Sequence, residues 1–279
     1  MGGVSPSYIG PFRLWLECTF PFCWLLFAPP LVRFSTNLPQ VALFFPRSLA
    51  GVPKCRYKTH VMEFIWVVPR EALLGPEGLH GFLPLSSQEV ENRFLAPARE
   101  KGFFVERRWA ETQPAFKQPI PYVAVCQAGK VLCLTRLATQ GEKRLHGRRS
   151  IGVGGHINPC DLPTDSASAE ADLFTQACLR ELQEELSFSA PPAALTPLGV
   201  LNDDTTEVGS VHIGLVYRLD IPVDNEMAVQ VRETDAMLGS FEPLADLERL
   251  AGAEDDPFET WSSLLLSSGA LRGEIASLS

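Results

Sequence analysis

The chain has 279 residues, 46% of them hydrophobic, and a formal net charge of −9, which allows a packed core and excludes a disordered protein. Residues 1–60 hold six basic residues and one acidic residue, whereas the remainder holds 18 basic and 32 acidic residues. An acidic folded part excludes a broad basic groove for direct nucleic-acid binding, although local arginines and a bound metal still allow a nucleotide-sized ligand.

Residues 1–61 are interpreted as an N-terminal extension outside the fold. Pro11–Phe34 is rich in aromatic residues and leucine, but Glu17 and several prolines interrupt it, so no apolar run reaches the ~20 residues of a membrane span. A membrane anchor is therefore the weaker interpretation. A transit peptide is one alternative, and a natural start at Met62 is the interpretation we favour.

Seven cysteines are scattered along the chain without a C-x-x-C pair. This usage fits a reducing compartment and argues against a zinc knuckle. We therefore expect a cytoplasmic protein, with organellar targeting or an N-terminal anchor left open by the first 61 residues.

Residues 62–279 are expected to form one domain, with 62–120 as an N-terminal elaboration. A helix over 87–101 is bounded by Ser86 or Ser87 as its cap and by Gly102, and Ala128-Gly129-Lys130 indicates a hairpin. The apolar pattern predicts strands at 64–68, 122–127, 131–136, 150–154, 198–201 and 211–219, and helices at 87–101, 169–186, 246–250 and 258–266. Strands and helices that alternate in this way predict an α/β sandwich.

The helix at 169–186 carries three acidic residues on one face. At 100° per residue, Glu181, Glu184 and Glu185 fall within a 100° arc, beside an apolar stripe that would pack on a core. Like charges at this spacing oppose one another and weaken the helix unless a cation compensates them. Carboxylate oxygens in such a cluster suit Mg²⁺ or Mn²⁺.

The run Arg180 to Phe188 resembles the second half of the Nudix hydrolase signature, G-x5-E-x7-R-E-U-x-E-E-x-G-U, in which U is a bulky aliphatic residue. Ser187 replaces the glycine of that signature. Gly155 resembles the leading glycine, yet it lies 25 positions before Arg180 instead of 14, an insertion of 11. The phrase Ser150–Asn158, followed by Asp161, also resembles a Nudix subgroup with a lengthened box loop.

Two positions of the signature stay open at this point. Asp172 lies eight residues before Arg180, where the first glutamate belongs, and Glu170 lies two residues earlier, so either or neither takes that place. A serine at position 187 would cost about 1 kcal/mol if the helix ended there with a positive φ, as the family glycine does.

The resemblance implies an α/β/α sandwich with a mixed sheet and metal-dependent hydrolysis of a diphosphate bond. It implies Mg²⁺ or Mn²⁺ as cofactor, held by Glu181, Glu184, Glu185 and the carbonyl of Gly155. The expected catalytic residues are Glu184, Glu185 and Arg180, with Arg180 acting more through an ion pair to a glutamate than on the substrate.

Outside the box, the predicted substrate-binding residues are Arg136, Arg144, Arg148 and Glu233. The arginines, with the neighbouring Arg149, could hold phosphate oxygens, and surface charge is the simpler interpretation of each. Glu233 could supply an additional base or ligand, with an ordinary loop glutamate as its alternative.

Four other residues are more easily explained by local structure. His146 and His156 flank the strand that enters the box. His156 could point into the site, since it follows the glycine, but local hydrogen bonding is the simpler interpretation of a histidine beside a loop. Asp203 and Asp204 are better explained as a turn pair than as a metal contact.

The expected partner is a small-molecule nucleotide or pyrophosphate, without nucleic acid or membrane; the oligomeric state stays open, a homodimer included. A Nudix-fold binding module without turnover is the main alternative, and an isomerase of the isopentenyl diphosphate type lacks its residue arrangement here. The substrate is left unnamed, because loops outside the box choose the leaving group.

Overall fold

The computed structural model describes residues 62–76, 78–136, 148–163, 172–188, 195–221, 229–232 and 237–272. All of them belong to the second of two compact units, Gln40–Ser279, and none to the first, Met1–Pro39. The interpretations of residues 1–61 therefore lie outside the described residues. In the part of the chain that is described, no helix combines the length and the apolar character that a membrane span requires.

Within these residues, ten strands form one mixed sheet. They are β1 (Phe64–Pro69), β2 (Gly81–Pro84), β3 (Phe103–Glu106), β4 (Phe116–Gln127), β5 (Lys130–Arg136), β6 (Arg149–Ser150), β7 (Gly152–Val153), β9 (Leu195–Asn202), β10 (His212–Asp220) and β12 (Met237–Pro243). The main order is β12-β5-β4-β10-β9-β2, in which only β4 and β10 are parallel neighbours. A separate pair is formed by β8 (Leu186–Phe188) and β11 (Val229–Val231).

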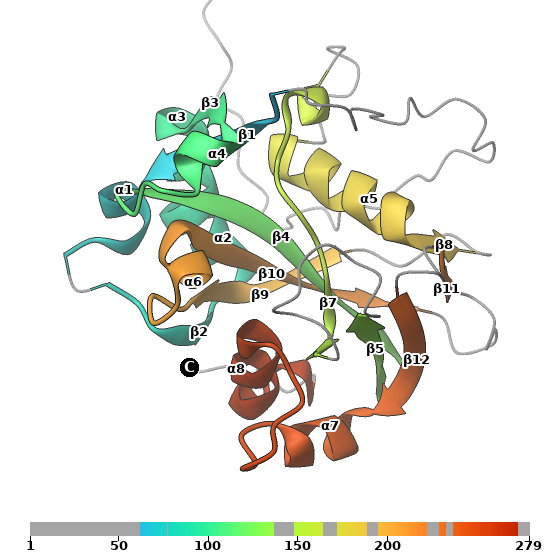
Figure 1. Ribbon diagram of the computed structural model, residues 1–279. Helices are drawn as coiled ribbons and strands as arrows, with labels where there is room; N and C mark the ends of the chain where they lie inside the picture. The colour runs from blue at the N-terminus through green and yellow to red at the C-terminus, as the bar shows by residue number, and fades with distance from the viewer. Residues whose placement is uncertain are drawn as a thin grey trace, which may run out of the picture. The chain divides into compact units, whose positions relative to one another are not determined.

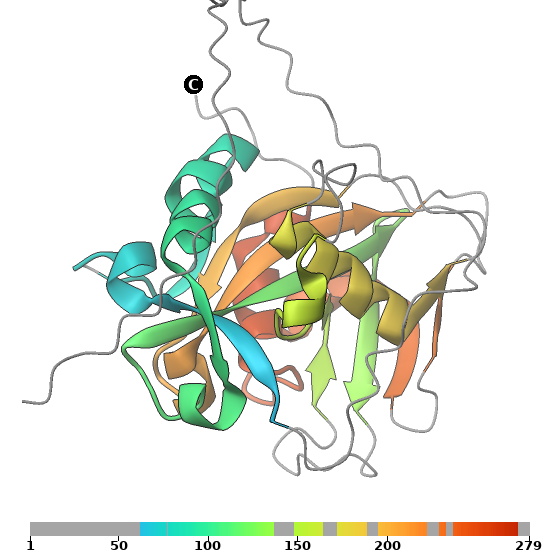
Figure 2. The same cartoon turned by 90° about the horizontal axis from the view of Figure 1, so that it is seen from above.

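Helices cover both faces of the sheet (Figure 1). The helices are α1 (Arg70–Leu74), α2 (Ser87–Val90), α3 (Ala96–Lys101), α4 (Arg107–Ala110), α5 (Leu173–Glu185), α6 (Glu207–Val211), α7 (Leu244–Leu250) and α8 (Thr260–Ser268). Figure 2, seen from above, places the sheet between α5 and the red C-terminal helices. The two faces are thus covered by helices from different parts of the chain.

The core is divided in the same way, because successive strand residues point to opposite faces. Val123 of β4 belongs to the hydrophobic cluster that contains Phe174 and Leu182 of α5. The next residue, Ala124, belongs to the second cluster, with Leu265 of α8. This confirms the predicted α/β/α sandwich with a mixed sheet.

The helix predicted at 87–101 is present with one irregularity. It begins as α2, where Ser86 and Glu89 form a reciprocal capping box, and it ends as α3 before Gly102. Between them, Glu91–Leu95 forms a π-helical turn. Pro97 lies in the first turn after it and cannot donate a backbone hydrogen bond to the preceding turn, which accounts for the wider winding.

The central strand β4 begins at Phe116, six residues before the predicted start. Pro119 and Pro121 lie in this additional part of the strand, although a proline cannot donate to a ladder. The parallel ladder of β4 with β10 nevertheless runs from Gln118 to Cys126. Residues 62–120 therefore share the sheet with later parts of the chain, through β1, β2, β3 and the first part of β4.

The box helix α5 ends differently from the expected turn. Leu186 has the extended values φ −122° and ψ 151°, and Ser187 lies in β8 opposite Gln230. Among the described non-glycine residues only Ala128 has a positive φ, of 49°, in the hairpin between β4 and β5. The strain considered for Ser187 is therefore absent, because a strand begins where the family signature has its glycine.

Candidate active site

The helix α5 presents an apolar face to the sheet and a graded acidic face to the other side. Phe174 and Leu182 are buried. The side chain of Glu181 is 13% exposed and that of Glu184 is 50% exposed. The acidic face thus runs from a nearly enclosed carboxylate to an open one, a gradient suited to holding a polar ligand at its outer end.

Arg180 occupies the centre of this face. Its Nη1 donates to Glu181 Oε1 at 2.8 Å and lies 3.6 Å from Glu184 Oε1. Its Nη2 donates to the carbonyl of His156 at 2.8 Å. These contacts place the guanidinium between two glutamates of its own helix and the loop after β7. The expected role in orienting a glutamate stays a prediction.

Asp161 is the site residue that the sequence reasoning missed. Its carboxylate accepts from Nε of Arg180 at 2.7 Å and from Nη2 at 3.0 Å, and its side chain is only 2% exposed. Burial lowers the pKa of Arg180, but the bonds to Asp161 and Glu181 outweigh it and raise that pKa above its ordinary value. The pair is bidentate and nearly closed to water.

A forward count would have found Asp161. It lies six positions after Gly155, where the signature G-x5-E places its first acidic residue, so the 11-residue insertion follows it. Counting backwards from Arg180 led instead to Asp172. That residue caps α5, accepting from the backbone N–H of Thr175 at 2.9 Å, and it pairs with Arg99. Glu170 lies outside the described residues.

Gly155 lies directly against the carboxylate of Glu181. A Cβ added at Gly155 would lie 2.4 Å from Glu181 Oε1, so only glycine leaves this carboxylate where it is. Burial raises the pKa of Glu181, and the negative charges of Glu184 and Asp161 act in the same direction despite Arg180. A main-chain carbonyl region beside a crowded carboxylate is a donor set that fits Mg²⁺ or Mn²⁺.

The structure describes only some of the other predicted site residues. Glu185 is half-buried, and its carbonyl accepts from the backbone N–H of Arg232 at 2.8 Å. Arg148 donates to the carbonyl of Asp256 at 2.8 Å, in the segment before α8. Arg136 is described only by its backbone, while Arg144, His146 and Glu233 lie outside the described residues. Their proposed roles stay predictions.

We call Asp161, Arg180, Glu181, Glu184 and Glu185 the box cluster. A second polar group, the histidine cluster, consists of Glu111, His156 and His212. Their ligand atoms lie within 4.8 Å of one another, and no other group of three or more His, Cys, Asp or Glu residues in the described ranges converges in this way. The box glutamates do not converge like this.

The two imidazoles of the histidine cluster face each other. Their Nε2 atoms are 3.1 Å apart, and His156 Nε2 is 2.9 Å from Oε1 of the buried Gln118. Burial lowers the pKa of His156 well below its usual range, and it also lowers that of His212. Both rings are therefore neutral at pH 7.

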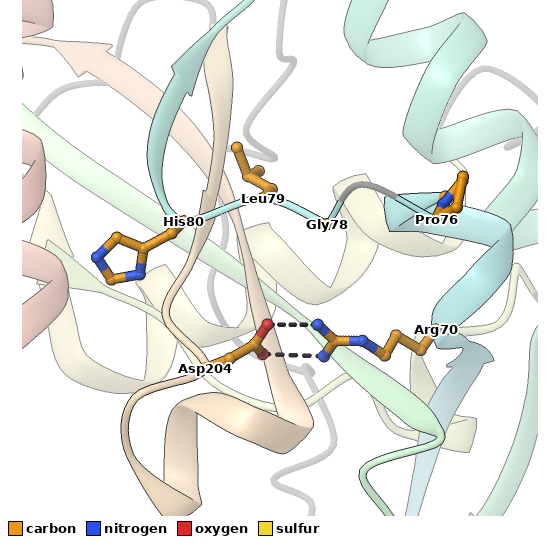
Figure 3. A pocket seen from close by; sticks show the side chains of 7 residues that line it. Arg70, Pro76, Gly78, Leu79, His80 and Asp204 are labelled. Carbon is orange, nitrogen blue, oxygen red and sulfur yellow. Dashed lines mark hydrogen bonds and ion pairs between the residues drawn. The ribbon is translucent and has the colours of Figure 1, made fainter.

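The polar interior continues from His212 to a pocket on the surface. The fully buried Lys117 donates to the carbonyl of His212 at 3.1 Å and to Asp204 at 2.7 Å. Asp204 also pairs with Arg70, and this pair lines a cavity of about 410 Å³ with Leu79 and His80 (Figure 3). Asp204, which the sequence favoured as a turn residue, therefore also forms ion pairs with Arg70 and Lys117.

Asp203 beside it is almost fully buried. Its Oδ1 accepts from the backbone N–H of Thr205 at 3.0 Å, an Asx turn, and its Oδ2 has no hydrogen-bond partner among the described residues. This geometry agrees with the turn interpretation.

Comparison with known proteins defines the class. No family model matches the chain. Protein YmaB of Bacillus subtilis (strain 168) is 34% identical over 209 residues, which cover 73% of this chain and 96% of YmaB. The crystal structure of Tm1382, a protein assigned to the Nudix hydrolases, matches 75% of this chain and 100% of its own with 28% identity and a TM-score of 0.59.

A more distant structure, the MutT protein from Methanosarcina mazei Go1, has 16% identity, covers 57% of this chain and 96% of its own, and gives a TM-score of 0.36. The mixed sheet between helices and the acidic helix α5 define a Nudix fold. The chain belongs to the Nudix hydrolase family.

Proposed function

We propose that the protein is a metal-dependent hydrolase that cleaves a diphosphate bond in a nucleoside diphosphate linked to another moiety, or in a related pyrophosphate. The observation that carries the proposal is the arrangement on α5. Arg180 anchors Glu181 and the buried Asp161, while Glu184 stays half exposed beside them. A buried anchor with an accessible carboxylate next to it is what a positioned general base requires.

The residues that would hold Mg²⁺ or Mn²⁺ are Glu181, Glu184 and Glu185, with the carbonyl of Gly155. Bound there, the ion supplies positive charge that neutralises phosphate oxygens and stabilises the charge on the leaving group. The close approach of Gly155 to Glu181 supports this donor set, because a side chain at Gly155 would fill the space between them.

In the proposed reaction the chain's own groups handle the proton. Glu184 or Glu185 accepts a proton from water while the water oxygen forms a bond to phosphorus. The bond from phosphorus to the bridging oxygen breaks, and that oxygen leaves with its electron pair and is then protonated. Arg180 acts as a positioning residue, since its guanidinium is already bonded to Asp161, Glu181 and the His156 carbonyl.

The test is turnover by purified full-length protein with Mg²⁺ or Mn²⁺ on a panel of dinucleotides, sugar nucleotides and nucleoside triphosphates. We expect phosphate-containing products from at least one of these classes, dependent on the metal. Binding of a panel member without product from any of them would overturn the hydrolase and favour a binding module. A product formed equally well in EDTA would overturn the metal dependence.

A further inference from the structure

The histidine cluster joins three segments that are far apart in the sequence. Glu111 follows α4, His156 lies in the loop after β7, and His212 opens β10. His156 follows Gly155 directly, and its carbonyl accepts from Arg180, so a main-chain hydrogen bond at His156 connects the two clusters. None of the three side chains belongs to the box signature.

The tautomer of His212 is set by a backbone contact. Its Nδ1 lies 2.7 Å from the carbonyl of Val208, and a carbonyl only accepts, so Nδ1 carries the proton. The neutral ring then offers an unprotonated Nε2 to His156. A histidine whose second nitrogen donates to a carbonyl is the usual orientation of a metal ligand.

The spacing of the nitrogens agrees with a shared ion. Two imidazole nitrogens at ~2.05 Å from a tetrahedral zinc ion are about 3.3 Å apart. The observed separation of the Nε2 atoms of His156 and His212 is 3.1 Å. Without an ion, the same distance requires one ring to donate to the other.

A separate observation comes from Gln118, which is 1% exposed. Its Oε1 faces His156, but its amide Nε2 has no hydrogen-bond partner among the described residues. An unpaired buried amide is destabilising, because its N–H has lost its hydrogen bonds to water. Water or a ligand oxygen held at the histidine cluster would supply the missing acceptor.

Nearby charge leaves the carboxylate of Glu111 available. Arg107 donates from Nε to Glu111 Oε1 at 3.3 Å, and it also pairs with Glu63 at 3.0 Å. Arg107 thus divides its charge between two carboxylates. Glu111 is exposed and keeps a second oxygen for a cation.

We propose that Glu111, His156 and His212 form a site for a zinc-type divalent transition metal, distinct from the box cluster. Two imidazoles and one carboxylate are a donor set that binds zinc and leaves a fourth position open. Mg²⁺ prefers an all-oxygen site, so the two clusters differ in the ions that they select. Gln118 contributes either its Oε1 to the ion or its N–H to a bound water.

The experiment uses Co²⁺ as a spectroscopic substitute for zinc on untagged full-length protein in excess Mg²⁺. We expect one Co²⁺ per chain with visible absorption typical of nitrogen and oxygen ligands, displaced by Zn²⁺. The His212→Gln variant should bind Co²⁺ at least about 100-fold more weakly, and Glu111→Gln at least about tenfold more weakly. A thiolate charge-transfer band would assign the ion to cysteine and overturn the proposal.

Two matched controls separate this site from others. His80→Gln alters an exposed histidine outside the cluster, and Glu184→Gln alters the box cluster, so both should keep the Co²⁺ spectrum and affinity. His212 is nearly buried, so circular dichroism must first show that its variant folds; Glu111 is exposed and gives an independent test. Equal Co²⁺ binding by wild type and Glu111→Gln, or loss of the ion in excess Mg²⁺, would overturn the site.

Discussion

The box cluster and the histidine cluster meet at Gly155 and His156, but the chain assembles them in different ways. The box cluster lies between residues 161 and 185 and carries its own cation, Arg180. The histidine cluster draws on residues about a hundred positions apart, and its neighbours include the neutral Gln118 and the cation Arg107. A local motif therefore supplies several carboxylates with their own cation, while the sheet topology brings together two imidazoles and one carboxylate.

The largest expected effect tests whether turnover belongs to the box cluster. Glu184→Gln removes a carboxylate without changing its size, and Glu185→Gln does the same beside it. We expect either variant to lower kcat by about 100-fold or more, because proton transfer by a positioned base contributes that much. Steady-state kinetics on the substrate identified in the panel would measure it.

Glu100→Gln on the exposed surface of α3 is the matched control and should keep wild-type kinetics. Because Glu184 is half exposed, its variant should unfold at nearly the wild-type urea concentration. If Glu184→Gln and Glu185→Gln both kept full metal-dependent activity, the box assignment would be falsified.

The second prediction concerns Arg180, the positively charged side chain of the box cluster. Arg180→Met leaves the almost fully buried carboxylate of Asp161 without its cation, which should lower the free energy of unfolding by about 3–5 kcal/mol. The free energy of unfolding of Arg180→Lys should lie between those of the wild type and Arg180→Met, because lysine keeps the positive charge but lacks the planar guanidinium. Urea unfolding followed by circular dichroism measures all three proteins.

Arg249→Met is the matched control for this effect. Arg249 pairs with Asp246 while 74% of its side chain is exposed, so its removal should cost less than about 0.5 kcal/mol. If Arg180→Met lowered the free energy of unfolding as little as Arg249→Met, the ion pair of Arg180 with Asp161 would not be what holds the loop after β7 to α5.

The third prediction separates packing from chemistry at the junction of the clusters. Gly155→Ala places a methyl group against the carboxylate of Glu181, which is the end of a flexible side chain and can move. We expect little change in unfolding but a fall in kcat of about 100-fold, because ligand groups displaced by an ångström lose that much.

Gly154→Ala is the variant to compare with Gly155→Ala. Its Cβ would lie 1.7 Å from the carbonyl oxygen of Pro121, which is backbone and cannot turn away. The cost should fall on stability, at about 2–3 kcal/mol. If the two variants behaved alike, by urea unfolding and by kinetics, Gly155 would have no special relation to Glu181.

The same division explains what the sequence could predict. The acidic face of α5, its apolar stripe and the capping of α2 are local patterns, and each is present in the structure. Asp161 was also available locally, by counting six residues from Gly155. Glu111 and His212 carry no local signal, because only the parallel pairing of β4 with β10 brings His212 beside Gln118 and His156.

Departures from the family pattern were harder to judge from one sequence. Whether Ser187 would be strained depended on the turn after α5, and that turn is set by the pairing of β8 with β11, a contact with residues more than forty positions away. The sequence pattern likewise predicted the central strand only from residue 122, whereas its ladder with β10 begins at Gln118.

The smallest expected effect tests the end of the box helix. Ser187→Gly restores the family glycine, but position 187 lies in an extended strand and not in a left-handed turn. Glycine should therefore destabilise the protein by about 0.5–1 kcal/mol, because it loses more backbone freedom on folding. Ser187→Ala is the control, and it should change the free energy of unfolding by less than about 0.5 kcal/mol. A gain of about 1 kcal/mol for glycine, measured by urea unfolding, would mean that α5 ends in the left-handed turn of the family signature and that β8 does not pair with β11.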